Sequence, residues 1–265
     1  MDYKYFKLEK ISEDKGILLW TFCRPPMNAL NIDVIEEMGR CLDAIQYDSE
    51  VKAIVFTGEG KAFIAGADID YMYKSDVEKC MELCNQGAAL MRRMETMPKI
   101  FIAAVNGFCL GGGLETALAC DLRLASTKAK FGLPEVGLGI IPGYGGGIRL
   151  PRAIHPAKAK EMLYTGRHIG AQEAYEAGLV LKVVEPEALM DEAIALAKAI
   201  RKNSPHAVGC AKICACKTAD VDLETAMLIE ASMFRTCAAS ADKAEGMGAF
   251  LEKRAAVFNS EKYQY

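Results

Sequence analysis

The stretch NGFCLGGGLET, residues 106–116, brings a run of consecutive glycines directly up to residues that favour a helix. The segment leading into it, IFIAAVNG at residues 100–107, is apolar and ends in glycine, as is typical of a buried strand. Glu115 falls in the first turn of the predicted helix, where the helix dipole favours a carboxylate. We therefore predict a strand, a tight turn and a helix, with Glu115 close to the turn.

The glycines of this turn allow three interpretations. They can form a tight turn that binds no ligand, in which case Glu115 is a solvated residue of the first helical turn. They can hold the phosphates of a nucleotide, but neither G-x-G-x-x-G nor G-x-x-x-x-G-K-S/T can be written through these residues. They can also leave unpaired N–H groups at a helix N-terminus, facing an anionic reaction intermediate. The residues favour the first and third interpretations over nucleotide binding.

Outward from this stretch, the chain alternates apolar runs with amphipathic segments. The pattern predicts a β-hairpin, with strands at residues 5–8 and 17–22 around the turn SEDKG, and further strands at residues 53–60 and 121–126. It also predicts a helix with Asn31 as its N-cap and a second helix at residues 77–97. From Pro186 onward only helical periodicity is found. This order predicts an α/β fold that contains parallel strand pairs, with a core over residues 1–200 and a helical oligomerisation region over residues 201–265.

Composition and charge exclude several classes of protein. The chain has 265 residues and a formal net charge of −3, which favours neither nucleic acid nor an anionic membrane surface as a partner. The N-terminus lacks the apolar segment of a signal peptide, and no apolar run is long enough to span a membrane. We therefore predict a cytoplasmic protein that does not bind membranes.

The ten cysteines are dispersed along the chain and are predicted to be reduced, apolar packing residues. The closest approach to a ligand cluster is Cys210, Cys214 and Cys216, but their spacing matches no usual zinc motif. The sequence therefore predicts no metal site.

Two further segments are candidates for a site beside the glycines of residues 106–116. In AFIAGADID, residues 62–70, small side chains would allow a second backbone N–H to reach the same ligand oxygen, because parallel strands end side by side. Glu135 lies in a glycine-rich loop among apolar neighbours, which would remove water from the carboxyl and raise its pKa. A solvated surface position for Glu135 stays open at this point.

Taken together, the motifs RPPMNAL, KAFIAGADI, IAAVNGFCLGGGLE, FGLPEVGLGIIPGYGG and EGMGAFLEKR resemble, in this order, the crotonase superfamily. Within the superfamily they are most similar to enoyl-CoA hydratases, and the resemblance runs from about Gly16 to Phe258. It implies a spiral core of repeated ββα units, followed by a helical C-terminal region that builds a homotrimer or a dimer of trimers.

The resemblance also assigns the site residues. It implies an oxyanion hole at the amides of Ala67 and Gly112, and catalytic carboxyls at Glu115 and Glu135. Glu115 would orient and deprotonate a water molecule, and Glu135 would deliver a proton to C2 of the substrate. Further residues implied to bind the acyl-CoA substrate are Ala29, Ala65, Gly66, Asp68, Ile69 and, from a neighbouring subunit, Lys253.

The implied reaction is the reversible addition of water to a short- or medium-chain trans-2-enoyl-CoA, such as crotonyl-CoA in fatty acid β-oxidation. It needs no cofactor, because coenzyme A is part of the substrate. One alternative is isomerisation of a 3-enoyl-CoA or another reaction of the superfamily, although isomerases of the superfamily generally work with a single carboxylate at the position of Glu135. A second alternative is RNA binding without catalysis, which the acidic pI of about 5.8 disfavours.

Overall fold

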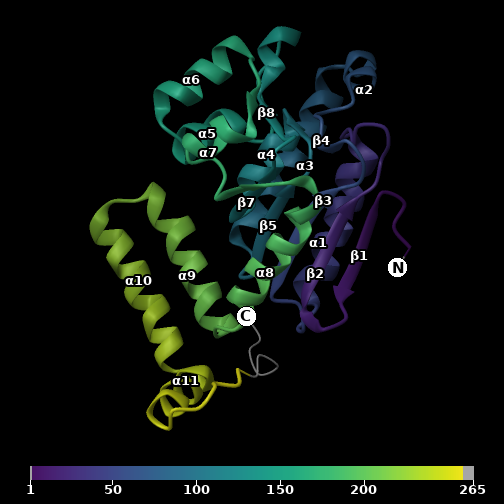
Figure 1. Cartoon of the computed structure of the whole chain (residues 1–265). Helices are drawn as coiled ribbons and strands as arrows, with labels where there is room; N and C mark the ends of the chain where they lie inside the picture. Colours follow the sequence, from purple (N-terminus) through teal and green to yellow (C-terminus); the bar gives the residue numbers. More distant parts are fainter. Residues whose placement is uncertain (1, 259–265) are drawn as a thin grey trace.

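The computed structural model describes residues 2–258, and it begins with the predicted β-hairpin (Figure 1). Strands β1 (Phe6–Ile11) and β2 (Asp14–Phe22) pair in antiparallel register, with Phe6 opposite Phe22. The pairing register shifts between Lys10 and Ile11. Strand β2 begins at Asp14, inside the segment SEDKG that was predicted to be the turn. The hairpin forms one edge of the main sheet.

The main sheet has the strand order β1-β2-β3-β5-β7-β10. Its remaining strands are β3 (Ala53–Gly58), β5 (Ile100–Val105), β7 (Leu122–Ser126) and β10 (Lys182–Val184). From β2 onward all neighbours pair in parallel, which confirms the α/β prediction. Every residue of β3 and β5 is buried, which explains their unbroken apolar sequence, because both faces of these strands are covered.

A second, smaller sheet has the order β4-β6-β8-β9. Its strands are β4 (Ala62–Ile64), β6 (Phe108–Leu110), β8 (Lys130–Gly132) and β9 (Ile169–Gly170). Each of β3, β5 and β7 in the main sheet is followed by a short strand of the second sheet and then by helical structure. The chain therefore advances by one strand in both sheets with each repeat, which is the expected ββα spiral.

Helices cover both faces of the main sheet. Helix α1 (Ile32–Tyr47) begins after Asn31, whose side chain accepts a hydrogen bond from the Val34 N–H, as the N-cap prediction required. Helix α3 (Val77–Thr96) agrees with the prediction at residues 77–97, and buried side chains of both helices join the larger core. Helix α8 (Leu189–Arg201) packs its apolar side chains on the opposite face of the sheet.

Shorter helical elements connect the strands and surround the second sheet. They are α2 (Ile69–Lys74), α4 (Gly112–Ala119), η1 (Pro134–Leu138), α5 (Gly146–Ala153), α6 (Pro156–Thr165), α7 (Ala171–Glu176) and η2 (Pro186–Ala188). Among residues 2–258, no helix combines the length and apolar character needed to cross a bilayer.

The C-terminal helices extend away from the sheets (Figure 1). They are α9 (Pro205–Lys217), η3 (Thr218–Asp220), α10 (Leu223–Ala238) and α11 (Ala241–Leu251). The buried Lys212 ties α9 to the core, because its Nζ lies 2.9 Å from Asp121 Oδ2. Helix α10, by contrast, has no fully buried residue within the described chain. The division between residues 1–200 and 201–265 falls at the end of α8 and stays a prediction.

Candidate active site

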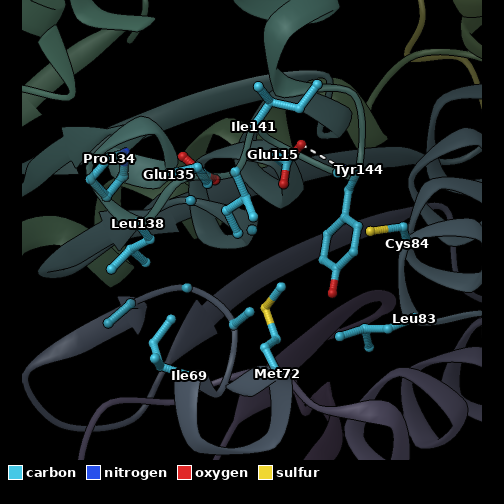
Figure 2. A pocket seen from close by; sticks show the side chains of 17 residues that line it. Ile69, Met72, Leu83, Cys84, Glu115, Pro134, Glu135, Leu138, Ile141 and Tyr144 are labelled. Carbon is cyan, nitrogen blue, oxygen red and sulfur yellow. Dashed lines mark hydrogen bonds between the residues drawn. The ribbon is translucent and has the colours of Figure 1, made fainter. Parts of the chain in front are cut away.

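A cavity of about 200 Å³ opens between the glycine turn before α4, the loop after β4 and the η1 region (Figure 2). Glu115 and Glu135 lie on one wall of it, and Ile69, Met72 and Leu83 lie on the opposite wall. Its other lining residues are Ala65, Gly66, Ala67, Cys84, Gly111, Gly112, Pro134, Leu138, Ile140, Ile141, Gly143 and Tyr144. The cavity is therefore largely apolar, with two acids and several bare backbone segments, as is common for sites that bind small molecules.

Helix α4 presents Glu115 to this cavity. The side chain is buried, and its Oε1 accepts hydrogen bonds of 2.7 Å from the backbone N–H groups of Tyr144 and Gly146. Burial raises the pKa of Glu115, while these two amides act in the opposite direction by stabilising the carboxylate. With Oε1 held by the backbone, Oε2 is left for another partner. Glu115 is therefore fixed in position and is not the solvated helix residue that the first interpretation of the glycines required.

Glu135 reaches the same cavity from η1, a turn of 3₁₀ helix. It is buried, and its Oε2 has no hydrogen-bond partner among residues 2–258. Burial raises the pKa of Glu135 to about 7, and the nearby charge of Glu115 adds to this shift. At neutral pH this carboxyl therefore carries a proton much of the time. The surface position left open for Glu135 is wrong, because packing around η1 removes the carboxyl from water.

The glycines before Glu115 meet different steric needs. Gly111 has a φ of 52°, and a Cβ on it would lie 2.9 Å from Glu135 Oε1. A Cβ on Gly113 would lie only 1.9 Å from the carbonyl oxygen of Ile64, so α4 can pack on β4 only without a side chain there. The glycines thus bring the start of α4 against the neighbouring loop and leave room for the second acid.

The two residues predicted to form the oxyanion hole, Ala67 and Gly112, both lie at the cavity. Leu30 forms a parallel bridge with Ala67, in which its N–H donates to the Gly66 carbonyl and its carbonyl accepts from the Asp68 N–H. The N–H of Ala67 therefore points away from Leu30. Gly112 is the first residue of α4, so its N–H has no partner within the helix. Both residues line the cavity, and that their amides bind one oxygen stays a prediction.

The remaining predicted binding residues divide into two groups. Ala65, Gly66 and Ile69 line the cavity. Ala29 and Asp68 are instead joined by Arg24, whose guanidinium donates to the Ala29 carbonyl at 2.6 Å and pairs with Asp68 Oδ2 at 2.7 Å.

Lys253 does not belong to either group. It lies just beyond α11, exposed and with a positive φ of 55°, and it does not line the cavity. Its assignment to a neighbouring subunit therefore stays a prediction.

Sequence reasoning missed the residues at the apolar end of the cavity. The Tyr144 ring is buried and held tightly, because a Cβ on Gly87 of α3 would lie 2.5 Å from it and a Cβ on Gly112 would lie 3.1 Å from it. The ring extends beyond Glu115 toward Met72 and Leu83 (Figure 2). Arg24 was missed as well. The only sequence signal for Tyr144 is its place in the glycine-rich segment PGYGGG, residues 142–147.

Comparison with known proteins identifies the family. The model of the enoyl-CoA hydratase/isomerase family matches residues 12–261. The crotonyl-CoA hydratase of Syntrophomonas wolfei is 45% identical over 98% of this chain and 100% of its own length. The short-chain-enoyl-CoA hydratase of Clostridium acetobutylicum is 44% identical over 92% of this chain and 95% of its own.

Solved structures agree with the sequence relatives. The crystal structure of an enoyl-CoA hydratase from Bacillus anthracis has a TM-score of 0.93 and 37% identity, covering 97% of this chain and 100% of that one. An enoyl-CoA hydratase structure from Geobacillus kaustophilus has a TM-score of 0.91 and 39% identity, covering 98% and 100% of the two chains. The match to the family model and these similarities along the full chain show that this protein belongs to the enoyl-CoA hydratase/isomerase family.

Proposed function

We propose that this chain catalyses the reversible addition of water to a trans-2-enoyl-CoA, giving a 3-hydroxyacyl-CoA. The observation that carries the proposal is the pair of buried carboxyls, Glu115 and Glu135, on one wall of a cavity that also contains the amides of Ala67 and Gly112. An isomerase needs one acid–base group to move a proton, whereas hydration needs one group for the water and one for carbon. The retained pair therefore favours hydration.

The reaction follows from the protonation states of the two acids. Glu115 acts in its carboxylate form, which accepts hydrogen bonds from two amides, and it takes a proton from a water molecule as the water oxygen bonds to C3. The C2–C3 π electrons move toward the thioester, and its carbonyl oxygen becomes the negatively charged oxygen of an enolate. Glu135, protonated because of its raised pKa, then donates a proton to C2. Exchange of protons with solvent restores both groups after release of the 3-hydroxyacyl product.

The amides of Ala67 and Gly112 would stabilise the enolate oxygen more than the neutral thioester carbonyl. Hydrogen bonds from fixed donors strengthen as negative charge develops on the acceptor, so they lower the barrier rather than only improving binding. Loss of one such donor typically costs about 10²–10³ in rate. The backbone supplies these donors without any side chain, consistent with the small residues on both segments.

Hydration assays on enoyl-CoAs of different chain length test both the proposed reaction and the shape of the cavity. Because Tyr144 is packed between Gly87 and Gly112, we expect the cavity to accept short acyl chains best. Loss of the conjugated thioester absorbance, measured over enoyl-CoAs of about four to ten carbons, should give the highest kcat/KM for the shortest, since each methylene in such a pocket changes binding by about 1–3 kcal/mol. Faster turnover of a 3-enoyl-CoA than of crotonyl-CoA would instead identify an isomerase.

The pH dependence of the reaction tests the protonation states of Glu115 and Glu135. Only the singly protonated pair, with Glu115 ionised and Glu135 protonated, can perform the hydration step. Because the pKa of Glu135 is about 7 rather than the ordinary glutamate value of 4.5, its proton is retained up to neutral pH and lost above it. We therefore expect kcat/KM for crotonyl-CoA to fall about tenfold per pH unit well above pH 7. A profile that stays flat to about pH 9 would contradict the role of Glu135 as proton donor.

The assembly implied by the family resemblance, a homotrimer or a dimer of trimers, is part of the same proposal. Helices α10 and α11 expose large apolar side chains that a contact between subunits could cover. These are Leu223, Met227, Leu228, Phe234, Met247, Phe250 and Leu251. Lys253 lies just after the end of α11, so the same contact would place it near a neighbouring subunit.

A further inference from the structure

The interface between α9 and α10 contains a cluster of metal-ligating side chains that the proposed reaction does not use. His206 and Cys210 lie one turn apart on α9, and Cys237 faces them from α10. One ligand atom from each residue can be chosen so that all three lie within 4.8 Å of one another. Cys210 Sγ and His206 Nε2 are 4.0 Å apart. His206 and Cys210 are buried, and Cys237 is partly buried.

We propose that His206, Cys210 and Cys237 form a binding site for Zn²⁺ between α9 and α10. An imidazole nitrogen and two thiolate sulfurs are ligands that zinc prefers, and they favour it over Mg²⁺ or Ca²⁺, which select oxygen. In a tetrahedral zinc site with the usual bond lengths, neighbouring ligand atoms lie about 3.6–3.8 Å apart. The observed 4.0 Å between Cys210 and His206 is close to that spacing. The separations that involve Cys237 are within 4.8 Å, so side-chain rotations would have to shorten them by up to about 1 Å to reach that spacing.

A fourth ligand is available on the same helix. Cys214 follows Cys210 by one turn, so His206, Cys210 and Cys214 lie along one side of α9. Among the described residues, the group of ligand atoms within 4.8 Å of one another does not include Cys214, so its sulfur would have to rotate toward the ion. Zinc bound by the first three residues can thus recruit Cys214 or keep a water molecule in the fourth position.

The opposite side of α9 is already fixed to the core. Lys212 donates hydrogen bonds to the carbonyls of Met94 and Lys99 and pairs with Asp121, while Cys216 is near the same charges. Helix α10 lacks such an anchor within the described chain, where none of its residues is fully buried. A bound ion would add a direct link between α10 and the anchored α9. Binding to the folded chain alone stabilises that chain, so zinc should raise the thermal stability of this helix pair.

The same two sulfurs could react differently under oxidising conditions. A disulfide between Cys210 and Cys237 would consume both thiol ligands, and it would need an oxidant to accept two electrons and two protons. Metal binding deprotonates the thiols directly and needs no electron acceptor.

Zinc titration of the full-length, reduced and chelator-treated protein tests the proposal. With a chromophoric chelator as competitor, we expect about one equivalent of tight Zn²⁺ per chain. Cobalt in place of zinc should give the intense visible bands of a tetrahedral ion and a thiolate charge-transfer band.

The variants Cys210→Ser and Cys237→Ser should each weaken Zn²⁺ binding by at least about 100-fold, since partners outside the coordination shell alone account for about 10–100-fold. Cys216→Ser is the matched control on the other side of α9 and should bind zinc like the wild type.

The outcome does not depend on the proposed reaction. None of the three ligands lines the cavity with Glu115 and Glu135, so hydration of crotonyl-CoA should proceed in the metal-free protein. Zinc should raise the melting temperature of the wild type and of Cys216→Ser but not that of Cys237→Ser. The proposal is overturned if the reduced wild type takes up no zinc, if cobalt shows only octahedral, oxygen-ligand bands, or if Cys216→Ser lowers the affinity as much as Cys237→Ser does.

Discussion

Replacing Glu135 with Gln is expected to lower kcat for hydration of crotonyl-CoA by about 10²–10⁴-fold. Gln has nearly the same shape but cannot deliver a proton to C2, and the glycine turn that accommodates the side chain at Gly111 is unchanged. Binding of a non-reactive acyl-CoA should stay within a few-fold of the wild type, because the amides of Ala67 and Gly112 are backbone groups. Stopped-flow or steady-state loss of enoyl absorbance gives kcat, and calorimetric titration gives the affinity.

Stability provides the control that separates lost chemistry from lost folding. The folded-state pKa of Glu135 is raised from 4.5 to about 7, so ionising this buried carboxyl destabilises the folded chain increasingly as pH rises through that interval. Gln carries no charge to bury, so at pH 8 the variant should be as stable as the wild type or more stable, by up to about 3 kcal/mol. A variant that loses activity and is also destabilised at pH 8 would point to a structural defect. Near-normal turnover would refute the catalytic role.

Replacing Glu115 with Gln should also reduce kcat by about 10²–10⁴-fold, for a different reason. The amide oxygen of Gln can still accept the hydrogen bonds from the Tyr144 and Gly146 N–H groups, so the loop should keep its position. What is lost is the group that removes a proton from water. The residual rate and the affinity for an unreactive acyl-CoA, measured as for Glu135, separate this loss from a change in the pocket.

The Glu115 variant has a second signature. The charge of Glu115 contributes to the raised pKa of Glu135, after burial, which is the larger cause. Removing that charge should therefore lower the pKa of Glu135 and move the alkaline fall of the residual activity to lower pH. An alkaline limb that keeps the wild-type position would show that the two acids do not interact, which would contradict the paired mechanism.

Much of the fold could be predicted from local patterns. The long strands β3, β5 and β7 carry enough apolar residues to be recognised, and the start of α1 was marked by the capping side chain of Asn31. The short strands β4, β6 and β8 were not predicted, since three residues are too few to show a period of two. The ββα spiral was expected only because whole motifs resemble the family.

At the site, too, the sequence identified residues but not how they are arranged in space. The motifs identified Glu115, Glu135 and the small residues around Ala67 and Gly112, whose roles stay predictions until tested. They gave no indication that Arg24 joins the segments of Ala29 and Asp68, or that Tyr144 closes the apolar end of the cavity. Nor could spacing along the chain reveal that Cys237 faces Cys210, because the two cysteines lie on different helices.

By itself the sequence determined which chemical groups are present and which local conformations are favoured: a capped helix, buried strands, glycine-rich turns and two acids beside them. Only the tertiary structure decided the properties of those groups. The pKa of Glu135 rises because packing around η1 removes its carboxyl from water and places Glu115 nearby. Desolvation and long-range proximity depend on segments far apart in the chain, so no local pattern can encode their magnitude.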